Sequence, residues 1–179
     1  MRTAAEVRDL LERLRIRTTG RLPADDWTLN PPLRLSTIVT FEAAYRVRLP
    51  EEYRDFLLHI GNGGAGPEGG LCRSEDYERR GRTDLERLHV EFDADAAEQD
   101  WDPEEEVDGD VMDDCLPLVD TAEGIYWLVV SGPYAGELWW DTRSDDSLPP
   151  EPVVDDEGEV TFRAWYDAWL DECEARWLK

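Results

Sequence analysis

The sequence predicts an α+β fold, in which an antiparallel-rich sheet is flanked by N-terminal helices and one C-terminal helix. Apolar residues recur at helical spacing near both ends of the chain, and short apolar runs separated by turn residues lie between positions 116 and 140. A chain of 179 residues is long enough for one core and short for two. We therefore expect a single domain over residues 1–179, with an N-terminal helix and connector at 1–35 and an acidic loop at 93–114.

The helix expected at 50–60 is the element around which the chain is organised. Pro50 sets the backbone angle of its first turn, and Tyr53 begins an apolar face that repeats three, four and seven positions later. Gly61 is expected to end the helix in a left-handed conformation, which glycine adopts without steric cost. The sharp turn that follows is built from Asn62, Gly63, Gly64, Gly66 and Pro67.

The other helices are predicted from capping residues and apolar spacing. Thr3 and Glu6 form a capping-box pattern ahead of a helix that reaches about residue 17, and Ser36 is expected to cap a second helix. Trp27 is expected to lie across a pair of helices. Thr161 precedes the last helix, whose aromatic stripe is typical of a core face. Strands are expected at 116–119, 124–130 and 137–140, with shorter ones at 88–92 and 153–154.

Negative charge is concentrated in the second half of the chain. The net charge is -24; residues 1–90 carry 15 Arg and 15 Asp or Glu, whereas residues 91–179 carry 28 Asp or Glu and four Arg or Lys. Such a field repels nucleic acid and anionic membranes and attracts basic proteins. The alternative is that the acidic surface serves solubility alone.

The sequence contains no pattern that predicts a membrane span or a secretory signal. The longest apolar run, 125–130, is far shorter than the ~20 residues of a spanning helix, and charged residues interrupt the first twelve positions. The 3 cysteines are widely spaced, which fits a reducing compartment. We expect a cytoplasmic protein with no membrane or nucleic-acid partner.

The glycines at 61–66 match the letters of the dinucleotide-binding motif Gly-x-Gly-x-x-Gly in the wrong structural context. That motif needs a strand before the glycines and a helix after them, whereas here a helix precedes them and Pro67 follows. His59 is expected to be a partly buried neighbour of the core and His89 to lie in a strand, and no Gly-x-Ser-x-Gly sequence supplies a nucleophile.

Metal-binding patterns are equally incomplete. The cysteines lack the paired spacing of a zinc site. An EF-hand alignment of 104–115 places Cys115 where calcium requires a bidentate Glu. We expect no enzyme activity, no cofactor and no metal site.

Three stretches resemble the SUKH superfamily, which includes the fungal Smi/Knr cell-wall regulators and many bacterial immunity proteins. The first runs from Leu49-Pro-Glu-Glu-Tyr53 through Gly61-Asn-Gly-Gly-Ala-Gly-Pro67 to Gly70-Leu71; the others are 116–130 and the helix that follows Thr161. The resemblance implies a non-catalytic binding module, and its bacterial branch implies immunity to a co-encoded toxin. The matching residues are those that form the fold, so they do not identify the target.

Carboxylates beside aromatic rings are the pattern that an interface for a basic protein would use. Trp139 and Trp140 face opposite sides of their expected strand, so at most one of them can be an anchor. We expect the partner to be a basic toxin domain, for example a nuclease; the alternative is a regulatory or scaffold module of the cell-wall-regulator kind. The candidate partner-binding residues are Trp101, Glu104, Glu105, Glu106, Asp108, Asp110, Glu137, Trp140 and Asp141.

Overall fold

The computed structural model describes residues 2–19, 27–77, 84–97, 112–142, 148–156 and 158–179. The helices are α1 (Ala4–Thr18), α2 (Leu35–Ala44), α3 (Glu51–His59), α4 (Ala94–Ala97) and α6 (Phe162–Trp177), with 3-10 turns η1 (Pro67–Gly69), η2 (Ser74–Asp76) and η3 (Leu85–Arg87). The strands are β1 (Cys115–Asp120), β2 (Ile125–Val129), β3 (Leu138–Asp141), β4 (Glu151–Pro152), β5 (Val154–Asp155) and β6 (Gly158–Glu159). The predicted α+β fold with a C-terminal helix is confirmed.

The four strands of the main sheet follow one another in the order β1-β2-β3-β4, each antiparallel to the next. Tyr126 pairs with Trp140 and Trp127 with Trp139 across β2 and β3. The strands predicted at 116–119, 124–130 and 137–140 are therefore confirmed. Val154 belongs to the separate hairpin of β5 and β6.

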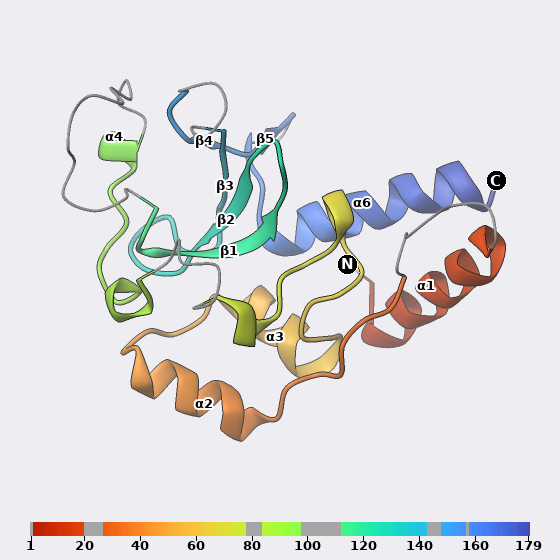
Figure 1. Ribbon diagram of the computed structural model, residues 1–179, viewed down its shortest axis with the longest axis horizontal. Coiled ribbons are helices and arrows are strands. Elements are labelled where there is room, and N and C mark those ends of the chain that lie inside the picture. Colours follow the sequence, from red (N-terminus) through yellow and green to blue (C-terminus); the bar gives the residue numbers. More distant parts are fainter. Residues whose placement is uncertain (1, 20–26, 78–83, 98–111, 143–147, 157) are drawn as a thin grey trace.

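The main sheet is buried on both faces, because a different group of apolar side chains packs against each one. Leu116, Leu118 and Leu128 face the larger cluster, which they share with α1, α3 and α6. Trp127 and Trp139 face a smaller cluster that includes Phe92 and Ala97. Figure 1 shows the sheet between the segment that carries α4, on the left, and α6 with α1, on the right.

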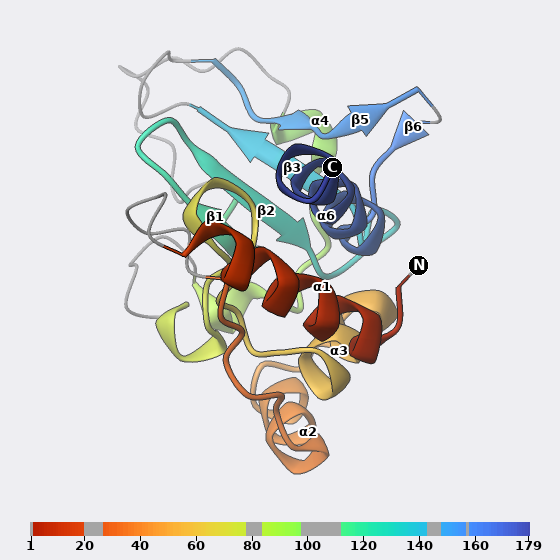
Figure 2. The ribbon, with the colours of Figure 1, turned by 90° about the vertical axis from the view of Figure 1, so that its right-hand side faces the viewer.

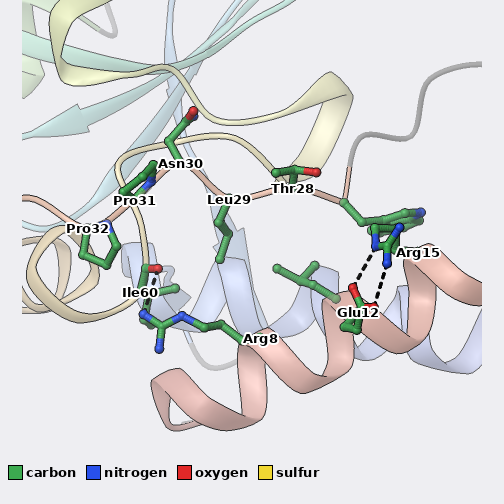
Figure 3. Close-up of a pocket in the computed structure, with 11 residues that line it drawn as sticks. Arg8, Glu12, Arg15, Thr28, Leu29, Asn30, Pro31, Pro32 and Ile60 are labelled. Atoms are coloured by element: carbon green, nitrogen blue, oxygen red, sulfur yellow. Dashed lines mark hydrogen bonds and ion pairs between the residues drawn. The ribbon is translucent and has the colours of Figure 1, made fainter.

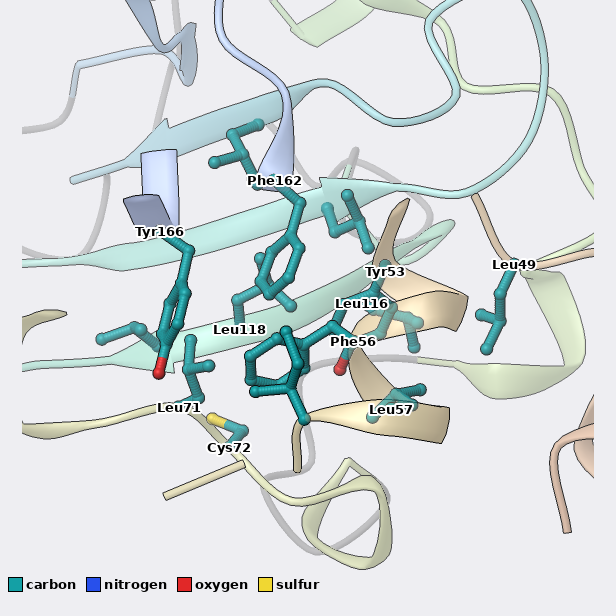
Figure 4. Packing of buried hydrophobic residues seen from close by; sticks show 14 of the residues in the cluster. Leu49, Tyr53, Phe56, Leu57, Leu71, Cys72, Leu116, Leu118, Phe162 and Tyr166 are labelled. Carbon is teal, nitrogen blue, oxygen red and sulfur yellow. The ribbon is translucent and has the colours of Figure 1, made fainter. Parts of the chain in front are cut away.

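α3 supplies the centre of the larger cluster, as its apolar spacing predicts. Its Tyr53, Phe56 and Leu57 are all buried, and the Phe56 ring meets the rings of Phe162 and Tyr166 edge-on at 5.1 and 5.0 Å (Figure 4). The buried hydroxyl of Tyr53 is hydrogen-bonded to that of Tyr77, and burial raises the pKa of both phenols. Pro50 occupies the N-cap position of α3, one residue before the position expected.

The turn after α3 requires glycine for two reasons: some positions have a positive φ, and others lie so close to neighbouring backbone that a side chain would collide with it. Gly63 and Gly64 have φ of +73° and +102°, but Gly61 does not adopt the left-handed conformation predicted for it. A Cβ on Gly61 would lie 2.9 Å from the carbonyl oxygen of Asn30, because the strand-like segment before α2 crosses at that point. Steric room, rather than φ, explains this glycine.

Two helix caps differ from their predictions. Arg34, not Ser36, occupies the N-cap position of α2, and its side chain makes no capping hydrogen bond. Thr161 does precede α6 in the expected extended conformation, but its hydroxyl does not cap the helix. The capping box of Thr3 and Glu6 on α1 is confirmed.

The strand predicted at 88–92 is absent; these residues follow η3 as a turn. The amides of Leu88 and Val90 bond to carbonyls three residues back, which satisfies the backbone locally. Leu88 joins the larger cluster and Phe92 the smaller one, so the segment passes around the sheet instead of adding to it.

α1 packs along α6, as the view in Figure 2 shows. Trp27 contacts both helices: its ring stacks on Trp169 at 5.9 Å, and its Nε1 donates to Thr18 Oγ1 at 2.8 Å. Arg2 lies among Asp167, Asp171 and Glu174 of α6. α1 therefore shares the larger core, and Arg2, just before the helix, neutralises part of the negative charge of α6.

Candidate partner-binding surface

Most of the predicted partner-binding residues lie outside the described part of the chain. Trp101, Glu104, Glu105, Glu106, Asp108 and Asp110 belong to this group. Glu137, Trp140 and Asp141, at or beside β3, can be placed.

The two adjacent tryptophans of β3 have different environments. Trp139 is 1 % exposed and packs against Phe92 at 4.9 Å. Trp140 lies on the opposite face and is half-buried, with its ring 4.3 Å from that of Tyr126, which in turn contacts Trp165 at 5.0 Å. Trp140 is thus the one of the pair that solvent and a partner can reach.

The two carboxylates beside these rings are less available than predicted. Asp141 is buried, and its Oδ2 accepts a hydrogen bond of 3.3 Å from Trp127 Nε1. Its role is internal, which corrects the expectation that it belongs to the binding surface. Glu137 is half-buried, and loss of hydration, with a smaller contribution from the charge of Glu159, raises the pKa of its carboxyl group.

A groove with three exposed carboxylates lies beside the turn that connects β2 and β3. It has a volume of about 400 Å³. Residues 91–95 form one side and the turn forms the other, and the buried Phe92 meets the exposed Tyr134 edge-on at 6.4 Å. We call it the acidic groove; its lining consists of Glu91, Phe92, Asp93, Ala94, Asp95, Pro133 and Tyr134.

The carboxylates of the acidic groove have no ion-pair partner among the described residues. Asp93 accepts a hydrogen bond from the amide of Ala96 at 3.0 Å, which leaves its charge uncompensated. Other carboxylates of the second half are neutralised by arginines: Asp114 bonds Arg87 at 2.8 Å, and Asp167, Asp171 and Glu174 surround Arg2. The unpaired negative charge of the described surface therefore includes this groove.

Sequence reasoning located one side of the groove but missed the other. Residues 93–95 begin the acidic loop predicted at 93–114, whereas no pattern in the sequence singled out Pro133 and Tyr134. Gly132 brings the two together: its φ is +83°, and a Cβ there would lie 2.6 Å from Cγ of Glu91. This close approach of Gly132 to Glu91 would have identified the groove, but it can be recognised only in the folded structure.

A second groove, of about 340 Å³, separates α1 from the segment that leads into α2 (Figure 3). Arg8 points across it and donates to the carbonyl oxygen of Ile60 at 3.4 Å, and also to that of His59. Arg15 is held by Glu12 in two hydrogen bonds of 2.7 Å. Because these charges are engaged internally, this groove offers a partner less than the acidic groove does.

The two histidines lie in environments other than those predicted, and the described residues contain no cluster that could hold a metal ion. His59 and His89 are both exposed, which corrects the prediction of a partly buried His59, and His89 lies in a turn rather than a strand. Within the described ranges, no three His, Cys, Asp or Glu side chains converge as a metal site requires. Also within them, no helix combines the length and the apolar character needed to cross a membrane.

Comparison with known protein families gives a match over the part of the chain that contains the glycine turn and the main sheet. The SMI1 / KNR4 family (SUKH-1) matches residues 32–164. The chain belongs to this family. No curated protein and no solved structure gives a match.

The SUKH match includes α2, α3, the glycine turn, the main sheet and the acidic groove. α1 precedes the matched residues, and most of α6 follows them. The helix pair formed by α1 and α6 is thus mostly outside the family pattern, whereas the candidate binding surface is inside it.

Proposed function

We propose that this SUKH protein is a non-catalytic binding module that neutralises a basic bacterial toxin by covering its positively charged surface. The observation that carries the proposal is the acidic groove, whose three carboxylates are exposed and lack cationic partners within the described residues. A protein that acts on nucleic acid must carry positive charge to hold phosphates, so an acidic inhibitor can occupy the same surface.

The groove has the composition of a small interface anchor. Carboxylates pair with Arg or Lys of the partner, and the exposed Tyr134 ring supplies apolar area and a face for a cation. The net charge of -24 would also accelerate association with a basic partner at low salt. The acidic run that begins in the groove would extend the contact through Trp101, Glu104, Glu105, Glu106, Asp108 and Asp110.

Trp140 is a second contact point for the same partner under this proposal. It is half-buried against Tyr126, so its ring is already oriented before binding, and the exposed Glu151 is its cross-strand neighbour. A ring held in place loses little conformational entropy on binding. Glu137 is at the end of the turn that carries Tyr134, where its amide bonds to the carbonyl of Tyr134 at 3.0 Å, and its carboxylate is a further candidate contact.

Co-purification with the C-terminal domain of the protein encoded by the neighbouring gene tests the proposal. We expect a stable complex that protects cells from that domain, that weakens as salt increases, and that weakens on Tyr134→Ala. A toxin gene next to this one is part of the expectation. A neighbouring toxin domain that is neither bound nor neutralised would overturn the proposal, and so would a complex insensitive to salt.

A further inference from the structure

α2 has an outward face without charge, which is unusual in a chain of which 35 % of the residues are charged. Ile38 is the buried residue of the helix, and Leu35 and Val39 are 56 % and 49 % exposed. Figures 1 and 2 both show α2 at the periphery, away from the sheet. The uncharged outward face, which we call the α2 stripe, consists of Leu35, Ser36, Val39, Thr40, Ala43 and Ala44, all exposed.

Positive charge borders the α2 stripe at both ends. Arg34 directly precedes the helix, and Arg46 and Arg48 lie two and four residues beyond its last residue, Ala44. All three arginines are exposed and make no ion pair with a described residue. Glu42, the acidic residue within the helix, does not offset them, because it pairs with Arg54 at 3.1 Å and accepts a bond from the amide of Leu49. The α2 stripe is therefore bordered by positive charge, whereas the acidic groove carries negative charge.

One of these arginines, Arg46, has a strained backbone conformation at the end of α2. Arg46 has a φ of +54° at the position after the helix where glycine is usual, and the next amide, of Val47, bonds back to the carbonyl of Glu42 at 3.1 Å. A left-handed conformation is unfavourable for a residue with a side chain. Glycine would fit this turn better, but it would remove the cation.

We propose that the α2 stripe is a second docking surface, which binds an amphipathic segment of a partner protein with carboxylates at both ends of an apolar strip. Charge complementarity selects this occupant, since a basic segment would meet Arg34, Arg46 and Arg48. A second copy of the chain fits less well. Two copies joined through the stripe would place these arginines close together, and a ten-residue helix is only about 15 Å long, too short to bury the ~800 Å² per partner of a standard interface.

The packing beneath α2 is compatible with a docking role. A small apolar cavity of about 30 Å³ lies between the helix and the core, lined by side chains that include Ile38, Phe41, Tyr53 and Tyr77.

A pair of synthetic helical peptides of about 15 residues tests the proposal. Both carry the same Leu and Ala strip; one has Glu at both ends and the other has Lys. Fluorescence anisotropy uses the full chain with Glu91→Gln, Asp93→Asn and Asp95→Asn, so that the Lys peptide cannot pair with the carboxylates of the acidic groove. It should give saturable binding of the Glu peptide, at least about tenfold tighter than that of the Lys peptide and weaker as NaCl rises. No saturable binding of the Glu peptide, or equal binding of both, would overturn the proposal.

Substitutions separate docking from fold stability. Leu35→Ser with Val39→Ser should weaken binding of the Glu peptide by about tenfold or more. Arg46→Gly should weaken it while raising the unfolding temperature by about 2–4 °C, because glycine relieves the strain. A loss of binding that always follows a loss of stability would contradict the docking role.

Two controls distinguish this inference from the proposed toxin-binding function. Glu91→Gln, Asp93→Asn and Asp95→Asn together should leave binding of the Glu peptide intact, because the acidic groove is a separate surface. Sedimentation of the protein alone should show a monomer. Self-association that Leu35→Ser and Val39→Ser abolish would instead identify the α2 stripe as a contact between copies and would refute the choice of occupant.

Discussion

Gly64→Ala should destabilise the protein far more than Gly69→Ala, although both glycines have almost the same φ angle. Their φ angles are +102° and +99°, so a side chain at either position introduces similar strain, about 1–2 kcal/mol. Their surroundings differ. A Cβ on Gly64 would lie 2.4 Å from the carbonyl oxygen of Thr28, whereas a Cβ on Gly69 would have no heavy atom within 4 Å.

The extra cost at Gly64 follows from the hydrogen bonds that this close approach supports. Gly64 exchanges two backbone hydrogen bonds with Leu71, of 3.0 and 2.7 Å, and the amide of Ala65 bonds the carbonyl of Thr28 at 2.9 Å. Moving the backbone aside would weaken these bonds, at about 1 kcal/mol each. We therefore expect Gly64→Ala to cost about 2–3 kcal/mol more than Gly69→Ala, which corresponds to an unfolding temperature lower by about 4–12 °C.

Urea and thermal unfolding of the two variants, monitored by tryptophan fluorescence, measure this difference directly. Gly69→Ala is the matched control, because it contains the strain without the collision. Equal losses of stability would refute the reasoning, since they would show that φ alone explains the glycines of this turn. A Gly64→Ala variant as stable as the parent chain would contradict the described path of residues 28–30 against the turn.

Three further predictions follow from individual contacts. Glu137→Gln should stabilise the protein at neutral pH and have little effect at pH 4. Burial raises the pKa of this carboxyl group in the folded state above its ordinary 4.5, so its ionisation opposes folding as pH rises through that range. If the variant and the parent chain differ in unfolding free energy by the same amount at pH 4 and pH 7, this reasoning is contradicted. Arg2→Gln should lower the unfolding free energy by about 1 kcal/mol, because it leaves Asp167, Asp171 and Glu174 without their shared cation, whereas the exposed Lys179→Gln should have no measurable effect in the same urea titration. Trp140→Ala should weaken partner binding about tenfold, and Trp139→Ala should instead lower stability by about 3–5 kcal/mol. If pull-down and unfolding assays show that Trp139→Ala impairs binding and Trp140→Ala impairs stability, the wrong indole has been placed at the surface.

Local signals in the sequence were sufficient for the elements whose residues interact mainly with one another or with a single core. α3 and α6 repeat apolar residues at helical spacing; α3 ends one residue before the predicted position, and α6 begins directly after Thr161 as predicted. Strands β1, β2 and β3 are short apolar runs between turn residues, so their pairing into an antiparallel sheet followed from the short connections.

Features that depend on tertiary contact could not be predicted in this way. The residues at 88–92 have the composition of a strand, but Leu88 and Phe92 enter different cores, which a straight strand cannot do. Alternation placed Trp139 and Trp140 on opposite faces, yet only the packing of Phe92 shows which face is covered. The acidic groove likewise required the contact between Gly132 and Glu91, two residues far apart in the sequence.

Which carboxylates have ion-pair or hydrogen-bond partners could not be predicted from the sequence either. Composition alone treated all carboxylates of the second half as one negative surface. In the structure Asp167, Asp171 and Glu174 share Arg2, and Asp167 and Glu174 also pair with Arg163 and Arg13 respectively. Asp141 was assigned to the surface because it follows the tryptophans, although its position in β3 directs it into the buried side of the sheet. The proposal of an acidic binding surface therefore depends on the groove carboxylates rather than on the total charge.

The most direct test of the account compares two variants with the same net charge. One carries Glu91→Gln, Asp93→Asn and Asp95→Asn in the acidic groove; the other carries Glu51→Gln, Asp55→Asn and Glu172→Gln, which are exposed and lie outside the groove. Asparagine at position 93 retains a side-chain oxygen that can accept the hydrogen bond from Ala96.

The dissociation constants of both variants for the neighbouring toxin domain decide the outcome. If the groove holds basic side chains of the partner, the groove variant should bind at least about tenfold more weakly than the parent chain, and the control should bind within about twofold of it. Equal weakening would mean that only the overall charge matters. Unchanged affinity of the groove variant would contradict the central claim that this groove is the contact surface.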